Sequence, residues 1–407
     1  MAFQVGANKS EFILRSLICK HIINMKTTVI QFVTTGMGDG GAETLIKDYV
    51  LLLDKEKFNV LIVCLDKLNT ASANYRRLAN EGITIISLSE NEPKFRLAII
   101  QKIWNRLFHK KYIAQQLLML IDKYHVNTIH AHLEVLACLS EARNKLANLG
   151  VNLLFTCHNE PTVIFKRTKW DSEENAANKL IKEAGLKLIA LHDRMRMELN
   201  ERFHVSNTIV IHNGVDYKKF SECPITRNEK RASLSIPDTA FVMGLVGRFA
   251  EAKNHGFLID IFKCVHDMNQ DSYLLLIGKG PNYDSVVDKI DRLGLKSNVL
   301  ILSSRTDIPE LLKAMDVFVM PSIYEGLPVS MVEAQAAGLR CVASDNITPE
   351  CFFSSNAVPL SLEQSPEEWA KVILNSNYKS SCNNDITMFD MTKEIKRLES
   401  LYIGKKL

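Results

Sequence analysis

Short apolar, β-branched segments alternate with helix-like patterns along most of this chain, and that alternation limits its fold more than any other feature. Strands that alternate with helices form parallel sheets covered by helices, so the pattern predicts an α/β protein. In the first half, the expected strands are Thr28–Val33, Asn59–Leu65, Ile83–Leu88, Thr128–His132, Asn152–Cys157, Lys187–Leu191 and Thr208–Ile211. In the second half, they are Phe241–Val246, Tyr273–Ile277, Asn298–Leu302, Asp316–Met320 and Arg340–Ala343.

The chain length favours two domains, because 407 residues exceed one ordinary hydrophobic core. The turn pair Asn213-Gly214 and the polar stretch from Ser221 to Asp238 form the expected linker. Two doubly wound domains would then face each other across a central cleft, with ligands at the carboxyl ends of the strands. The expected division is an extension at 1–24, domains at 25–212 and 213–375, and a tail at 376–407.

Charge and cysteine content exclude several functions. The 50 Lys and Arg residues against 46 Asp and Glu residues give a net charge of +4, which is too mild to indicate nucleic-acid binding. Nine cysteines are scattered singly, which argues against a zinc site or a disulfide framework and suits a reducing cytosol. We expect a cytoplasmic protein without a signal peptide, because Lys20 and His21 interrupt the apolar N-terminal pattern. Met25 is a candidate start.

Two acidic residues flank an expected helix N-terminus in the segment 321–338. Gly326 opens a turn after a buried strand, and Pro328 suits the first position of a helix, whose free N–H groups favour phosphate. Glu325 in the loop and Glu333 in the second turn would accept hydrogen bonds from hydroxyl groups of a ribose or a sugar. A diphosphate between two polyols is a nucleotide-sugar. The alternative is that Glu325 caps the helix and Glu333 is a solvated surface residue.

Glu325 and Glu333, with Gly326-Leu327-Pro328 after the first acid, resemble the E-x7-E signature of retaining GT-B glycosyltransferases of the group 1 (GT4-type) family. This family builds bacterial capsules, exopolysaccharide and O-antigen. The resemblance extends from about Thr28 to about Leu362. It implies the GT-B fold, with two Rossmann-like domains and a last helix that crosses back to the N-terminal domain, here expected at 390–402.

Two cations follow the first strand of the second half. Arg248 lies directly after that strand and Lys253 follows within a few residues, so both can converge on a diphosphate. In the resembled family, these positions hold the leaving pyrophosphate. Exposed cations on a loop remain the alternative. The Gly326 and Leu327 amides would share in stabilising the negative charge.

A glycine-rich loop follows the first strand. Gly36, Gly38 and Gly41 satisfy a G-x-G-x-x-G pattern, and Asp66 ends the next strand, which together favour an NAD(P)-dependent oxidoreductase as an alternative function. The resemblance assigns the same loop differently, because Gly40 and Gly41 match positions that approach the donor phosphate and the acceptor. A tight turn is the third interpretation.

Further contacts to the donor are implied by the resemblance. Gly278 and Gly280 would let the backbone approach the nucleotide. Arg305 belongs to the segment beside the base, where Ser303 stands at a place often held by glycine. UDP is the expected nucleotide, with GDP as the alternative.

Two histidines end neighbouring strands, His132 and His158. His158 matches a family histidine near the donor sugar and is favoured over His132, although strand-end histidines are often structural. The resemblance implies retaining transfer by front-face attack. The chain has no D-x-D motif, so neither a metal nor another cofactor is expected.

The segment Lys94–Lys111 contains no acidic residue and repeats apolar residues at helical spacing, as in a basic amphipathic helix. It predicts either peripheral contact with an anionic membrane or an ordinary surface helix. Membrane contact would suit a polyprenyl-diphosphate-linked glycan acceptor. No nucleic acid is expected, because the segment lacks the groove of a strand binder. A sugar-nucleotide-binding subunit without turnover is the non-enzymatic alternative.

Overall fold

A computed structural model describes residues 26–405 except 91, 166–172, 304, 376 and 378–385. The expected extension 1–24, the candidate start Met25 and most of the segment 376–385 lie outside the described residues. Within the described ranges, no helix is both long and apolar enough to cross a bilayer.

The first domain is built on a parallel sheet with strand order β3-β2-β1-β4-β5-β6-β7. Its strands are β1 (Thr27–Val33), β2 (Phe58–Cys64), β3 (Thr84–Ser87), β4 (Thr128–His132), β5 (Asn152–Thr156), β6 (Lys187–Ala190) and β7 (Ile209–Val210). The helices between them are α2 (Gly41–Leu52), α3 (Ala73–Asn80), α4 (Ala98–Leu107), α5 (His109–Tyr124), α6 (Leu136–Ser140), α7 (Arg143–Asn148), α8 (Pro161–Ile164), α9 (Glu173–Ala184) and α10 (Asp193–Phe203).

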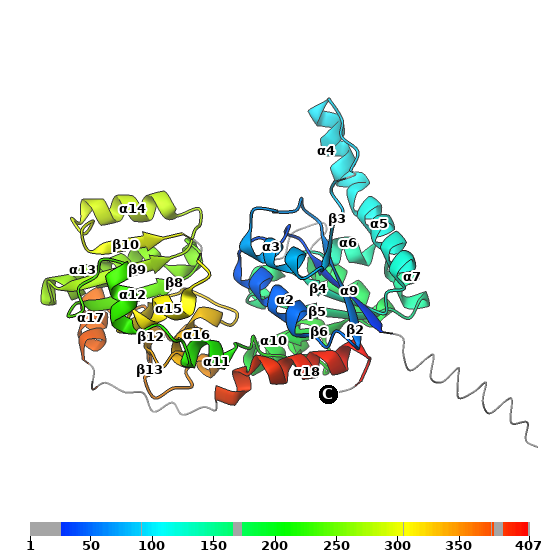
Figure 1. Cartoon of the computed structure of the whole chain (residues 1–407). Coiled ribbons are helices and arrows are strands. Elements are labelled where there is room, and N and C mark those ends of the chain that lie inside the picture. Colours follow the sequence, from blue (N-terminus) through cyan, green and yellow to red (C-terminus); the bar gives the residue numbers. More distant parts are fainter. Residues whose placement is uncertain are drawn as a thin grey trace, which may run out of the picture.

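The second domain repeats this architecture with strand order β10-β9-β8-β11-β12-β13 (Figure 1). Its strands are β8 (Phe241–Val246), β9 (Ser272–Ile277), β10 (Val299–Leu302), β11 (Val317–Met320), β12 (Arg340–Ser344) and β13 (Ala357–Leu360). The helices are α11 (Tyr217–Ser221), α12 (Arg227–Ser233), α13 (His255–Met268), α14 (Tyr283–Arg292), α15 (Ile308–Lys313), α16 (Val329–Ala336) and α17 (Pro366–Leu374), with 3-10 turns η1 (Glu251–Lys253), η2 (Pro349–Cys351) and η3 (Ile386–Phe389). The sequence missed β13, a four-residue strand that contains Pro359 and pairs with β12.

The strand order reverses once in each sheet, between β1 and β4 and between β8 and β11. In open parallel sheets, ligands bind beyond the carboxyl ends of the strands at such a reversal. Both predicted doubly wound domains are therefore confirmed. Loops after β1, β4, β8 and β11 are the places where a ligand is expected.

The expected linker is more ordered than its composition indicated. Residues 227–233 form α12, which starts with a capping box in which Thr226 and Glu229 exchange side-chain and backbone hydrogen bonds. Arg231 on this helix is fully buried, and its Nη2 donates to Asp316 Oδ2 at 2.8 Å. The charged residues of this stretch thus hold α12 against the second domain.

Two helix boundaries also differ from expectation. The segment Lys94–Lys111 is interrupted at Phe108, where α4 ends and α5 begins, so it is not one continuous helix. Pro328 precedes α16 as its N-cap instead of occupying its first helical position.

The last helix, α18 (Met391–Tyr402), crosses back to the first domain as predicted, and Figure 1 shows it running beneath that domain. Tyr402 and Leu398 belong to an apolar cluster with Val29 of β1, and the Tyr402 ring packs edge-on against Phe58. The helix therefore completes the core of a domain from which it is distant in sequence.

Candidate active site

The reversal point of the second sheet carries an ion pair between two predicted site residues. Lys253 Nζ lies 2.6 Å from Glu325 Oε1, and their side chains are only 16% and 14% exposed. Glu325 Oε1 has no well-oriented hydrogen bond within the described chain, so the contact is electrostatic. Arg248 lies two residues after the end of β8 and is exposed. Lys253 and Glu325 therefore lie together at this edge of the sheet, and the predicted convergence of Arg248 and Lys253 on a diphosphate stays a prediction.

The Gly278 and Gly280 positions are explained by backbone packing. A Cβ atom at Gly278 would clash with the Gly247 carbonyl oxygen, and one at Gly280 would clash with the Phe249 carbonyl oxygen. Phe249 N–H also donates to the Lys279 carbonyl at 2.9 Å. The two glycines therefore let the loop after β9 pack on the loop after β8, and their contact with a donor stays a prediction.

Glu333 lies on α16, where burial raises its carboxyl pKa to about 7 although the residue keeps some exposure. The positive charge of Lys219 on α11 opposes this shift. A carboxyl group that titrates near neutrality can accept from or donate to a polyol. Its proposed contact with a ribose is an expectation that the structure leaves untested.

Arg305 forms an ion pair with Asp307 in the same segment. Its Nε and Nη2 atoms lie 2.7 and 2.6 Å from the two carboxylate oxygens of Asp307. Asp307 also contacts Lys230. The guanidinium is thus already paired, and its role beside a base remains a prediction.

His158 and His132, the two predicted strand-end histidines, are in contact with each other. His158 Nε2 lies 2.8 Å from His132 Nδ1, and both side chains are buried. Burial lowers the pKa of His158 to about 4 and the pKa of His132 well below its ordinary value. Both rings are therefore neutral near pH 7.

The loop that carries Glu325 lies directly against the loop that carries His158. A Cβ atom at Gly326 would lie 2.5 Å from the His158 carbonyl oxygen and 3.2 Å from Asn159 Cα. Glycine is therefore needed for the two loops to approach. The predicted residues of the two domains, His158 on one side and Glu325 with Lys253 on the other, meet at this contact, and Leu327 next to it is buried.

Gly40 and Gly41 lie at the start of α2, beyond the carboxyl end of β1, at the reversal point of the first sheet. A side chain at Gly40 would clash with the Glu43 carboxylate, whereas Gly41 faces open space. A Cβ atom at Gly36 would clash with the Lys67 carbonyl oxygen, so glycine there allows the loop after β2 to approach closely. The geometry of this loop is compatible with a nucleotide-sugar donor and with NAD(P).

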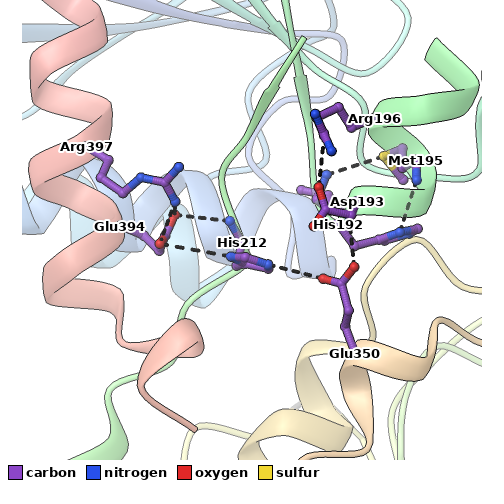
Figure 2. A network of polar contacts seen from close by, with 9 residues as sticks. His192, Asp193, Met195, Arg196, His212, Glu350, Glu394 and Arg397 are labelled. Atoms are coloured by element: carbon purple, nitrogen blue, oxygen red, sulfur yellow. Dashed lines mark hydrogen bonds and ion pairs between the residues drawn. The ribbon is translucent and has the colours of Figure 1, made fainter. Parts of the chain in front are cut away.

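One group of interdomain residues was missed by the sequence reasoning. Glu350 of η2 accepts a hydrogen bond from the Asp193 N–H at 2.8 Å, and its other oxygen lies 3.2 Å from His212 Nε2. The His212 N–H in turn donates to Glu394 of α18 at 3.1 Å. Figure 2 shows these residues converging from both domains and α18. Nothing local in the sequence marks them, because each is an ordinary polar residue until the domains dock.

Comparisons with known proteins agree with this geometry. The family described as "Glycosyl transferases group 1" matches residues 226–375, and "Glycosyltransferase Family 4" matches residues 39–219. EpsF of Bacillus subtilis, which is named as a glycosyltransferase, is 28% identical over 365 residues, covering 86% of this chain and 88% of that protein. A UDP-Gal:alpha-D-GlcNAc-diphosphoundecaprenol alpha-1,3-galactosyltransferase of Escherichia coli is 26% identical, covering 86% of this chain and 90% of that protein.

Among solved structures, Anabaena HepE in complex with UDP and glucose superposes with a TM-score of 0.73 at 19% identity, covering 93% of this chain and all of that chain. This likeness shows the shared fold. The two family matches fall on the two domains in order and leave only short segments unmatched. The chain belongs to the group 1 family of GT-B glycosyltransferases.

Proposed function

We propose that this protein transfers a sugar from a nucleotide-diphosphate donor to a glycan acceptor, with retention of anomeric configuration, in bacterial surface polysaccharide synthesis. The observation that carries the proposal is the Lys253–Glu325 pair at the reversal point of the second sheet, in direct proximity to the His158 loop. This arrangement brings a cation and an acid of the second domain against the loop of the first domain that carries the neutral His158. A diphosphate and a sugar ring need such complementary groups.

The proposed mechanism is mainly electrostatic. Arg248 and Lys253, with the backbone amides of Gly326 and Leu327, stabilise the negative charge that grows on the diphosphate as the sugar C1–O bond breaks. Glu325 accepts a hydrogen bond from a sugar hydroxyl while Lys253 holds its carboxylate in place. The departing phosphate assists in removing the acceptor proton. Because protein cations supply the positive charge, we propose that transfer needs no metal ion or other cofactor.

UDP is the proposed nucleotide and a lipid-linked glycan the proposed acceptor. The Escherichia coli relative is named for a UDP-galactose donor and a diphosphoundecaprenol-linked acceptor, and HepE was solved with UDP and glucose. Both names support a donor with a uridine diphosphate. The Glu333 carboxyl would contact the ribose, and Gly40 and Gly41 would lie toward the donor phosphate and the acceptor.

The surface of α4 and its flanks supports contact with an anionic membrane. Unlike an ordinary surface helix, α4 extends away from the domain body in Figure 1, and most of its apolar side chains are exposed. Those with the greatest exposure are Leu97 at 61%, Ile99 at 63% and Leu107 at 57%. Basic residues Lys94, Arg96 and Lys102 are exposed beside them. We propose that this surface places the protein on the cytoplasmic face of the membrane, near a lipid-linked acceptor.

Ligand titration followed by a turnover assay tests the function. Thermal shift with UDP, GDP and NAD should show the largest stabilisation with UDP. Slow hydrolysis of a UDP-sugar should accompany binding, and a panel of radiolabelled nucleotide-sugars with lipid-linked acceptor should identify the product. Stabilisation by NAD alone would favour the oxidoreductase. UDP binding without any hydrolysis or transfer would favour a non-catalytic binding subunit.

A further inference from the structure

Six buried polar side chains form a continuous hydrogen-bonded chain behind the candidate site, which we term the histidine relay. It runs from His158 through His132, Gln31, Tyr402 and His130 to Thr156. The five successive contacts measure 2.8, 2.7, 2.8, 2.8 and 2.7 Å. Its members come from β1, β4, β5 and the loop after β5, except Tyr402, which α18 inserts from a position 371 residues away from Gln31.

The Gln31 amide determines where the protons of the relay lie. Its oxygen faces His132 Nε2, so that nitrogen must carry a proton. Because the buried His132 ring is neutral, its Nδ1 is then an acceptor. The neighbouring His158 Nε2 must therefore be the donor in the 2.8 Å contact.

The other half of the relay is consistent with the same direction. The Gln31 amide nitrogen donates to the Tyr402 hydroxyl. Tyr402 can then give its own proton to His130 Nδ1, which leaves His130 Nε2 to donate to Thr156. Burial lowers the pKa of His130 to about 3, so this ring is neutral too. Every contact thus has one donor and one acceptor without any charged ring.

A reversed relay would satisfy the same contacts only if the Gln31 amide were turned around, with every proton moved to the other partner. In that state, His158 would carry its proton on Nδ1. The direction of the relay therefore sets the tautomer of His158, a residue that touches the Glu325 loop through its backbone.

We propose that Tyr402 is a positioning residue: by linking Gln31 to His130, it holds the Gln31 amide in the orientation that, through His132, gives His158 the Nε2–H tautomer. The His158 Nδ1 lone pair is then available to accept a hydrogen bond from a hydroxyl of the donor sugar. This assignment rests on the proposed function for its benefit to transfer, whereas the tautomer itself is a property of the unliganded protein.

The experiment compares the full-length protein with Tyr402→Phe, which removes only the hydroxyl. With histidine labelled by 15N, the wild-type His158 ring should show a protonated Nε2 and a bare Nδ1. In Tyr402→Phe, the Gln31 amide can turn without moving the protons of His130 and Thr156, so His158 should give averaged signals of both tautomers. The kcat for transfer should fall about 2- to 10-fold, as expected for one lost neutral hydrogen bond, with the KM for the donor nearly unchanged.

Tyr49→Phe is the matched control, because Tyr49 is buried in the same apolar cluster as Tyr402 and is not a member of the relay. It should leave the His158 signals as in the wild type. If Tyr402→Phe fails to fold, Gln31→Met breaks the relay one step earlier and should give the same averaging. The proposal would be overturned if the wild-type His158 were protonated on Nδ1, or if its signals were unchanged in Tyr402→Phe and in Gln31→Met. Either result would count even if the protein had no transferase activity.

Discussion

His212 of the first domain lies 3.2 Å from Glu350 of the second, measured from Nε2 to Oε2, and this contact ties the domains together beside α18 (Figure 2). Burial disfavours the charged ring, but the nearby carboxylates of Glu350 and Glu394 outweigh burial and raise the pKa of His212 to about 9. A pKa raised on folding stabilises the folded protein fully below about 6.5, and this contribution is lost as pH rises through about 9.

We therefore predict that Glu350→Gln lowers the melting temperature at pH 6 and has a smaller effect at pH 9.5. The loss at pH 6 should correspond to roughly 2–3 kcal/mol of unfolding free energy. Glu367→Gln, which alters an exposed pair with Lys371, is the control and should show little effect at either pH. A Glu350→Gln effect that is equal at both pH values would contradict the linkage to His212.

Arg248→Ala should reduce turnover far more than stability. Its side chain is exposed after β8, so its removal should change the unfolding free energy by less than about 0.5 kcal/mol. Loss of one preorganised cation should cost about 2–4 kcal/mol in the transition state, or about 30- to 10³-fold in kcat. Steady-state kinetics and thermal melts of Arg248→Ala are compared with those of Arg292→Ala, an exposed arginine on α14. Equal losses of folding and activity would exclude the proposed role.

Replacing Glu325 should restore the stability that is lost when Lys253 is replaced, but it should not restore activity. Lys253→Met leaves the Glu325 carboxylate largely buried without its cation, which should cost about 1–3 kcal/mol. Adding Glu325→Gln removes the unpaired charge and should restore most of that loss. The double variant should nevertheless remain inactive, because it lacks both side chains that we propose contact the donor. Chemical denaturation and donor hydrolysis, measured on all four proteins, test this, and a double variant no more stable than Lys253→Met would refute the coupling.

Glu333→Gln should make the protein more stable and weaken its binding of UDP. Burial raises the pKa of Glu333 to about 7, so the native state binds a proton more tightly and stability is lost as pH rises from about 4.5 through 7. Glutamine removes this cost, and because the residue keeps some exposure we expect a gain of about 1–2 kcal/mol at pH 8 and none at pH 5. Affinity for UDP, measured by calorimetry, should fall at pH 8. A variant less stable than the wild type at pH 8 would show that the carboxylate is not strained by burial.

Membrane contact through α4 should require both its apolar and its basic residues. The protein should co-sediment with vesicles that contain phosphatidylglycerol more than with phosphatidylcholine vesicles, and rising salt should release it. Ile99→Ser with Ile103→Ser should abolish binding without affecting stability, because both side chains are about half exposed or more. Leu149→Ser alters an exposed leucine elsewhere, at 62% exposure, and should bind normally. Indifference to anionic lipid would remove the membrane from the proposed function.

Local patterns predicted the architecture well, because a strand or helix is specified by apolar residues at spacings of two to four positions. Twelve expected strands were confirmed in place, and α18 was expected within a residue of its observed start. The turn chemistry around Gly326 and the spacing of Glu325 and Glu333 are equally local. The capping box of Thr226 and Glu229 at the start of α12 is a local signal too.

Contacts between distant polar side chains were decided by the tertiary structure alone. Nothing within a few residues of Lys253 indicates that its ammonium contacts Glu325, and Tyr402 has no local sign that it will meet Gln31. Such pairs depend on the strand order, on the docking of one domain against the other and on side-chain rotamers that only packing selects. The amino-acid sequence therefore determined which elements form and which residues could do chemistry, and the folded chain determined which of those residues are partners.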